Sequence, residues 1–438
     1  VVHFTSSTNS SESVMGRLRE RHGRLELANG AGSEQGEGGT CLRFPDSTTE
    51  ETERHLGMGE IEVRCPQGVP ARTPSSHTAT SRGPIVACHP SRPLAAASMP
   101  LDRQAQEESS SGVAVWRVGR GRSPDPAAVL AHELQSDVAA LSWRPVGGRD
   151  LAVGCGTGVA LWRVPPDPGA GALAVEGPVL TWLAPAPALA GTGQVNMLTW
   201  HPEGHLLAGV CRGVAGFQVW DVATGRATPV RATSDPTTAL AWSPCGAYLF
   251  QGHASGTLRL WETTAWTSQA WAYGGSHSVH SARAGPGPSL VVAAAWAPAR
   301  LSAQGLVLVA HAEAPGSLTA LHMTGASAPS LEAQPMPVSL AWPADGKEEV
   351  TGMAWNPDGQ RLAVSLAAAG RPATIVLYAI CCDPLVTTRV VGEVPSETED
   401  DATPTSVAFV GLKGSGPNHP LLAIARSSRI ALIPLEYA

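Results

Sequence analysis

The chain has 438 residues, a formal net charge of −7, and 47 glycines and 37 prolines. This charge gives no general attraction to nucleic acid or anionic lipid. The Gly and Pro content is high for a helical enzyme but below the roughly 25–30% of a low-complexity chain. The longest apolar runs, such as Ala373 to Cys382, fall well short of the roughly 18 residues of a membrane span, so we expect a soluble protein.

The first 80 residues differ in composition from the rest of the chain. Residues 1–80 are rich in Ser, Glu, Gly and Thr, a composition typical of disorder. Within them we expect at most one helix, around Val14 to Leu27, and one short strand over Glu60 to Cys65. From Pro84 onward, short apolar runs alternate with turns. The sequence therefore predicts a largely disordered N-terminal segment, which can supply a closing strand, and a folded domain over 84–438.

One pattern recurs along the folded domain: an apolar run ends in an aromatic residue or its substitute, in most cases followed closely by proline. The seven residues that end these runs, here called anchors, are Cys88, Trp143, Trp200, Trp242, Trp296, Trp355 and Phe409. Successive anchors are separated by 55, 57, 42, 54, 59 and 54 residues, close to the length of a four-stranded propeller blade with loop insertions.

A second alternating strand follows 19 to 28 residues after five of the anchors. These strands end in Trp116, Trp162, Trp220, Trp261 and Tyr378. Blades five and seven offer the weaker runs 318–323 and 430–435 instead. Trp266 and Trp271 bracket a polar segment that suits an exposed fourth strand. Trp342 does not fit the spacing, and we assign it to an insertion between blades five and six.

Polar or Pro/Gly-rich stretches separate the paired signals. We predict loops between blades at 101–112, 165–178, 274–288, 324–348 and 383–403.

Together the two signals predict an all-β fold, a seven-bladed β-propeller. A four-stranded sheet of this size cannot bury both faces alone and must stack on its neighbours. We expect five tryptophan anchors to be buried between neighbouring sheets: Trp143, Trp200, Trp242, Trp296 and Trp355. For ring closure, we expect Glu60 to Cys65 to form the outer strand of the last blade, beside Arg429 to Leu435.

The sequence offers no motif for catalysis or for a cofactor. Gly154, Gly156 and Gly158 lack the Lys-Ser/Thr pair of a phosphate-binding loop and predict a β-turn. No G-x-S-x-G elbow is present, and the eight cysteines show no zinc spacing. Four histidines pair neither at i, i+4 on a helix nor with a nearby cysteine: His201, His205, His253 and His311. We expect a non-enzymatic protein without catalytic, cofactor-binding or metal-binding residues and without direct nucleic-acid contact.

The blades resemble WD repeats, and Trp220 with Asp221 is the one clear Trp-Asp dipeptide. The buried Asp-His-Ser/Thr-Trp network of that family is largely missing, so we expect a degenerate member held mainly by packing. The order of the motifs over 84–437, and the stretch WETTAWTSQAW from Trp261 to Trp271, are similar to the Aladin family of WD-repeat nucleoporins.

This resemblance implies a scaffold subunit of the nuclear pore complex at the nuclear envelope. It further implies docking at the pore membrane through a transmembrane nucleoporin, contacts with other nucleoporins, and support of nucleocytoplasmic transport. Two alternatives stay open: a WD-repeat adaptor of another assembly, such as a ubiquitin ligase or a coat, and a propeller hydrolase. Co-purified partners would separate the two scaffolds, and carboxylates or histidines clustered at the central channel would indicate the hydrolase.

Overall fold

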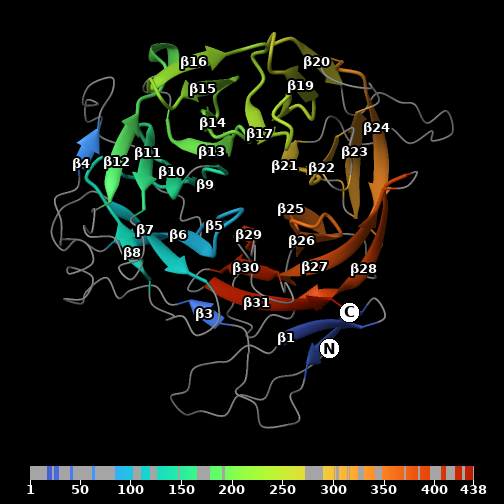
Figure 1. Ribbon diagram of the computed structural model, residues 1–438. Coiled ribbons are helices and arrows are strands. Elements are labelled where there is room, and N and C mark those ends of the chain that lie inside the picture. The colour runs from blue at the N-terminus through green and yellow to red at the C-terminus, as the bar shows by residue number, and fades with distance from the viewer. Residues whose placement is uncertain are drawn as a thin grey trace.

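Seven sheets are arranged in a ring around a central axis in the computed structural model (Figure 1). The structure describes residues 17–21, 24–28, 40–42, 62–64, 84–101, 110–118, 126–146, 148–164, 178–189, 193–271, 290–299, 301, 305–312, 314, 316–323, 330–340, 348–368, 371–382, 385–394, 406–410, 420–426 and 430–437. The predicted seven-bladed β-propeller is confirmed. Within this described part, no helix is long and apolar enough to cross a membrane.

Each blade is an antiparallel meander whose first strand lies nearest the axis (Figure 1). Blade one comprises β5 (Val86–Cys88), β6 (Leu94–Leu101), β7 (Ser110–Arg117) and β8 (Ala128–Leu130). Blade two comprises β9 (Ala140–Trp143), β10 (Asp150–Gly154), β11 (Val159–Arg163) and β12 (Val179–Leu183), followed by the short 3-10 helix η1 (Pro187–Leu189). Blade three comprises β13 (Val195–Trp200), β14 (Leu206–Cys211), β15 (Phe217–Asp221) and β16 (Arg226–Val230).

The remaining blades repeat this order. Blade four comprises β17 (Thr237–Trp242), β18 (Tyr248–His253), β19 (Leu258–Glu262) and β20 (Ser268–Trp271). Blade five comprises β21 (Val291–Trp296), β22 (Leu306–His311), β23 (Ser317–Met323) and β24 (Ala333–Ser339). Blade six comprises β25 (Glu349–Trp355), β26 (Arg361–Ala368), β27 (Arg371–Cys381) and β28 (Thr387–Val394). Blade seven contains β29 (Ser406–Val410), β30 (Leu421–Ala425) and β31 (Ile430–Tyr437).

Ring closure uses N-terminal strands, but not the predicted one. β3 (Thr40–Leu42) pairs antiparallel with β31, and β1 (Arg17–Arg21) pairs with β31 in parallel. The predicted closing segment instead contains β4 (Glu62–Arg64), which pairs in parallel with β12 and adds a fifth strand to blade two. Period-two patterning alone does not say which of several sheet edges a short strand will choose.

The helix expected around Val14 to Leu27 is also wrong. β1 pairs antiparallel with β2 (Arg24–Ala28) over five residue pairs. Leu25 and Leu27 alternate with charged residues in β2, which is a strand pattern once that segment is considered alone. The rest of residues 1–80, and with it the predicted disorder, lies outside the described residues.

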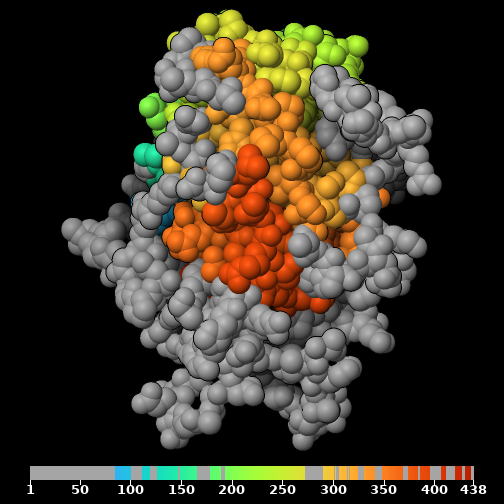
Figure 2. All heavy atoms as spheres, turned by 90° about the vertical axis from the view of Figure 1, so that its right-hand side faces the viewer, coloured from blue at the N-terminus to red at the C-terminus, as the bar shows by residue number. Residues whose placement is uncertain are grey.

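Two predicted loops contain the outer strands of blades five and six. β24 lies within 324–348 and β28 within 383–403. Thr388 Oγ1 on β28 donates to the carbonyl of Ser339, the last residue of β24, at 2.6 Å. The two strands lie side by side at the rim, orange beside orange-red (Figure 2). β24 carries Pro335 and Pro337, which are tolerated at an outer edge where no further strand needs their N–H groups. Polar, proline-containing edge strands therefore look like loops in the sequence. Residues 165–177, 272–289 and the connection containing Trp342 are outside the described residues.

The anchors link neighbouring blades through their indoles. The Nε1 atoms of Trp143, Trp200 and Trp296 donate to the carbonyls of Ala87, Ser142 and Ala241 at 3.0, 3.0 and 2.9 Å. Each acceptor is the residue just before the anchor of the preceding blade, so the same bond repeats around the inner ring.

One anchor departs from this pattern, and another follows it with a longer bond. Trp242 Nε1 donates instead to Gly246 of its own blade at 2.9 Å. Trp355 Nε1 donates to the Ala295 carbonyl over a longer distance of 3.4 Å. The side chain of Trp355 is half-buried, whereas the other four tryptophan anchors are buried. The expectation that Trp355 is buried is therefore wrong.

Candidate functional site

The contact between blades three and four holds a cluster of four aromatic rings, here called the aromatic cluster: Phe217, Trp242, Trp261 and Trp266. Phe217 lies 5.6 Å from Trp261, and Trp266 lies 6.3–6.4 Å from each of the other three, between ring centroids. Phe217, Trp242 and Trp261 are buried, while Trp266 is half-exposed. The cluster thus extends from the core between two blades to the surface, where Trp266 is accessible to a binding partner.

Trp266 lies in the turn between β19 and β20 with φ of 55°, a conformation that is unusual for a large side chain. The carboxylate of Glu262 holds this turn, since its two oxygens accept the N–H groups of Thr264 and Ala265 at 2.8 and 2.7 Å. Strained backbone at a partly exposed aromatic residue is a feature of ligand-binding sites.

The buried Glu262 has a lowered pKa, in spite of its burial. Desolvation acts to raise the pKa of this carboxyl, but the hydrogen bonds from Ala265 and Thr264 outweigh it and lower the value. Asp221 occupies the same place in blade three, where its Oδ1 accepts the N–H groups of Ala223 and Thr224. Glu262 therefore performs the role of the aspartate of a Trp-Asp dipeptide.

A chain of buried hydrogen bonds holds Trp261, one member of the aromatic cluster, in place. Trp261 Nε1 donates to Gln251 Oε1 at 2.8 Å, Gln251 Nε2 donates to Thr237 Oγ1 at 2.7 Å, and Thr237 Oγ1 donates to the carbonyl of Gly216 at 3.0 Å. The chain crosses three strands of blade four and ends in blade three. Beside the expected packing, blade four therefore contains a buried polar chain in place of the network that is missing from its WD repeat.

Blade two uses the same solution with different partners. Trp162 Nε1 donates to Gln135 Oε1 at 2.7 Å, and Gln135 in turn donates to the carbonyls of Ser111 and Leu130. Sequence reasoning missed both glutamines. The available signal was a single amide inside or beside an otherwise apolar strand, which has few explanations other than a buried hydrogen bond.

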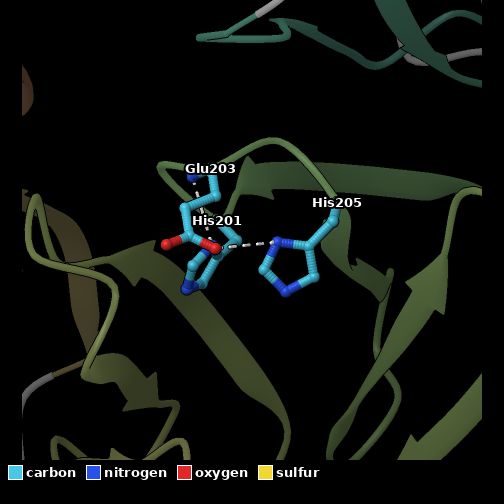
Figure 3. A group of neighbouring side chains, drawn as sticks. All are labelled: His201, Glu203 and His205. Carbon is cyan, nitrogen blue, oxygen red and sulfur yellow. Dashed lines mark hydrogen bonds and ion pairs between the residues drawn. The ribbon is translucent and has the colours of Figure 1, made fainter.

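The turn between β13 and β14 lies next to the aromatic cluster. His201 packs edge-on against Trp242, with ring centroids 5.0 Å apart, and against His205 at 4.5 Å. Glu203 lies between the two histidines in the turn, and its Oε2 is 3.5 Å from His205 Nδ1 (Figure 3). Burial lowers the pKa of His201, and the neighbouring His205 lowers it further. Both imidazoles belong to one five-residue turn, so their i, i+4 spacing brings them together without a helix.

The other residues considered from the sequence lie elsewhere. His253 and His311 are buried at the ends of β18 and β22. The glycines of blade two form the predicted turn between β10 and β11, where the Cys155 N–H donates to the Gly158 carbonyl at 2.8 Å. Among the described residues, His201, Glu203 and His205 are the one group of three histidine, cysteine or acidic side chains close enough to share a metal ion.

Known proteins agree with this architecture. The model for the WD domain, G-beta repeat, matches residues 228–262, which cover the end of β16 and the first three strands of blade four. Aladin from Arabidopsis thaliana is 29% identical over 316 residues, a match that spans 68% of this chain and 66% of the plant protein. This chain is similar to Aladin over about two thirds of its length and contains a match to the WD repeat. The expected resemblance to the Aladin family is confirmed.

Solved structures show the same fold at lower identity. The chain superposes on the β-propeller domain of Cps50 (Swd1) from Myceliophteria thermophila with a TM-score of 0.53 and 14% identity, covering 80% of this chain and 96% of that domain. A chain of the mitotic checkpoint complex gives a TM-score of 0.51 at 14% identity, covering 84% and 96%. At this identity the likeness concerns the fold alone.

Proposed function

We propose that this chain is a non-enzymatic scaffold subunit of the nuclear pore complex. In this proposal a transmembrane nucleoporin holds it at the pore membrane, other nucleoporins contact it, and it supports nucleocytoplasmic transport. The observation that carries the proposal is the similarity to Aladin across most of the propeller. Propellers suit this role because they present turns on two faces and outer strands around the rim to several partners.

We place the main docking surface on the exposed side of the aromatic cluster. It is centred on Trp266 and bordered by Pro244, Cys245, Thr264 and Ala265, all of which are exposed. Tryptophan is enriched among the few residues that dominate binding energy at protein interfaces. The buried rings of Phe217, Trp242 and Trp261 keep Trp266 in position, so a partner meets a preorganised side chain.

The substitution Trp266→Asn tests this surface. Asparagine tolerates a positive φ better than other non-glycine residues, so the turn should be kept while the ring is lost. If Trp266 dominates the contact, we expect a loss of about 2 kcal/mol or more, roughly thirtyfold in Kd. The readout is rim localisation of the fluorescently tagged full chain, with Leu385→Ala as matched control because Leu385 is 51% exposed and lies in blade six.

We expect the wild type and the Leu385→Ala variant at the nuclear rim and the Trp266→Asn variant to be diffuse, at similar melting temperatures. Unchanged rim localisation of Trp266→Asn would move the docking surface elsewhere on the ring. Rim localisation of the wild type that survives depletion of the membrane-spanning nucleoporins would contradict the docking mechanism. A diffuse, folded wild-type protein would favour a scaffold of another assembly.

A further inference from the structure

The turn from His201 to His205, with the sequence His-Pro-Glu-Gly-His, places three metal-binding side chains side by side (Figure 3). One ligand atom each from His201, Glu203 and His205 can be chosen so that all lie within 4.8 Å of one another. We propose that this turn is a binding site for one divalent transition-metal ion of the zinc type. The proposal is independent of the proposed scaffold function.

The spacing of the donor atoms suits such an ion. Zinc binds histidine nitrogen and carboxylate oxygen at about 2.0–2.2 Å, which puts neighbouring donors of a tetrahedral site about 3.4 Å apart. Glu203 Oε2 and His205 Nδ1 are already 3.5 Å apart. The three ligand atoms lie within 4.8 Å of one another, so closing the third corner requires only a shift of side chains, and two of these, Glu203 and His205, are exposed.

The turn is rigid before any ion arrives. The N–H of His201 donates to the Leu206 carbonyl at 3.0 Å, and the N–H of Gly204 donates to the His201 carbonyl at 2.8 Å. Pro202 fixes its own φ, and Gly204 adopts a φ of 72° that the tight reversal requires. Backbone bonds therefore present the three side chains, and the ion is not needed to fold the turn.

The donors also have suitable chemistry. Two imidazoles and one carboxylate favour zinc, cobalt, nickel or copper over magnesium or calcium, which prefer oxygen. His201 packs edge-on against Trp242, which fixes its ring beside the other two donors. His201 Nδ1 accepts the Glu203 N–H at 3.2 Å, so its lone pair faces that residue, and this long bond would be exchanged for the metal.

An ordinary ion pair does not account for the arrangement as well. Glu203 and His205 have 78% and 53% of their side chains exposed, and exposed pairs contribute little to stability. A pair between Glu203 and His205 also does not involve the imidazole of His201, whose Nδ1 faces Glu203. Three protein ligands leave one position of a tetrahedral ion for water or for a group from a partner.

Titration calorimetry of the full chain with Zn²⁺ tests the proposal, with Co²⁺ absorption as a second readout of tetrahedral ligands. We expect one ion per chain at pH 7.5 and at least tenfold weaker binding in His205→Asn and Glu203→Gln. His132→Asn, a histidine outside this group, is the matched control and should bind like the wild type. Mg²⁺ should give no heat.

Since backbone bonds hold the turn, the two test variants should melt like the wild type when no metal is present, which separates lost binding from lost folding. Two results would overturn the site: no Zn²⁺ binding by the wild type at micromolar concentrations, or equal binding by His205→Asn and the wild type. The second would place the ion elsewhere on the chain.

Discussion

Removing the amide of Gln251 tests whether a hydrogen-bond chain, rather than packing alone, joins blades three and four. In Gln251→Leu the indole N–H of Trp261 loses its partner at a site where the glutamine is 1% exposed. A buried donor without a partner costs about 1–3 kcal/mol. Thr237 keeps its own bond to the Gly216 carbonyl, so the loss should stay within that range.

A double-mutant cycle makes this prediction specific. Trp261→Phe removes the donor, so the added effect of Gln251→Leu should then shrink by about 1 kcal/mol or more. The measurement is urea unfolding at 25 °C followed by far-UV circular dichroism, comparing midpoints at constant slope. Gln334→Leu, at an exposed position of β24, should change stability by less than about 0.5 kcal/mol. Additive effects within about 0.3 kcal/mol would refute the coupling.

Three further predictions follow from burial, backbone angle and protonation. Trp200→Ala should cost about 3–5 kcal/mol and Trp355→Ala clearly less, because only the former is buried; equal midpoint shifts in urea would contradict this. Gly246→Ala should lower the melting temperature more than Gly213→Ala, and equal melting temperatures would contradict this. Both glycines have positive φ, but a Cβ at Gly246 would overlap the imidazole of His201, whereas a Cβ at Gly213 would have no atom within 4 Å. The wild type should have a larger free energy of unfolding than Glu262→Gln, by an amount that is constant above about pH 5 and shrinks below about pH 4.3, because folding lowers the pKa of Glu262. A difference in stability that grows on acidification would contradict this.

The inner strands could be predicted from the sequence because most of their side chains pack against neighbouring sheets and are therefore apolar. Trp143 and Trp200 end apolar runs whose residues meet a neighbouring sheet, so hydrophobic patterning identified both the strands and their repetition. Trp116 and Trp220 added the third strand of their blades by the same logic, and each is fully buried.

The outer strands could not be predicted in this way. β24 and β28 expose much of their length, so no apolar run separates them from loops. The choice of β3 over β4 for closing the ring depends on which sheet edge each strand meets, and that is a long-range property. Burial of Trp355 failed as a prediction because an identical motif does not ensure identical packing by the neighbouring blade.

The site residues depend on contacts between distant segments. Gln251 and Gly216 are joined through Thr237 across two blades, and no spacing in the sequence reports that contact. The approach of His201 and His205 was discounted because i, i+4 spacing was considered only on a helix. A tight turn closed by backbone bonds brings the two rings equally close.

Affinity purification of the tagged full chain from nuclear envelopes tests the central claim most directly. We predict that nucleoporins, including a membrane-spanning subunit, are enriched with the wild type and with Leu385→Ala, and are lost with Trp266→Asn. Recovery of ubiquitin-ligase or coat subunits in place of nucleoporins would contradict the assignment to the nuclear pore complex.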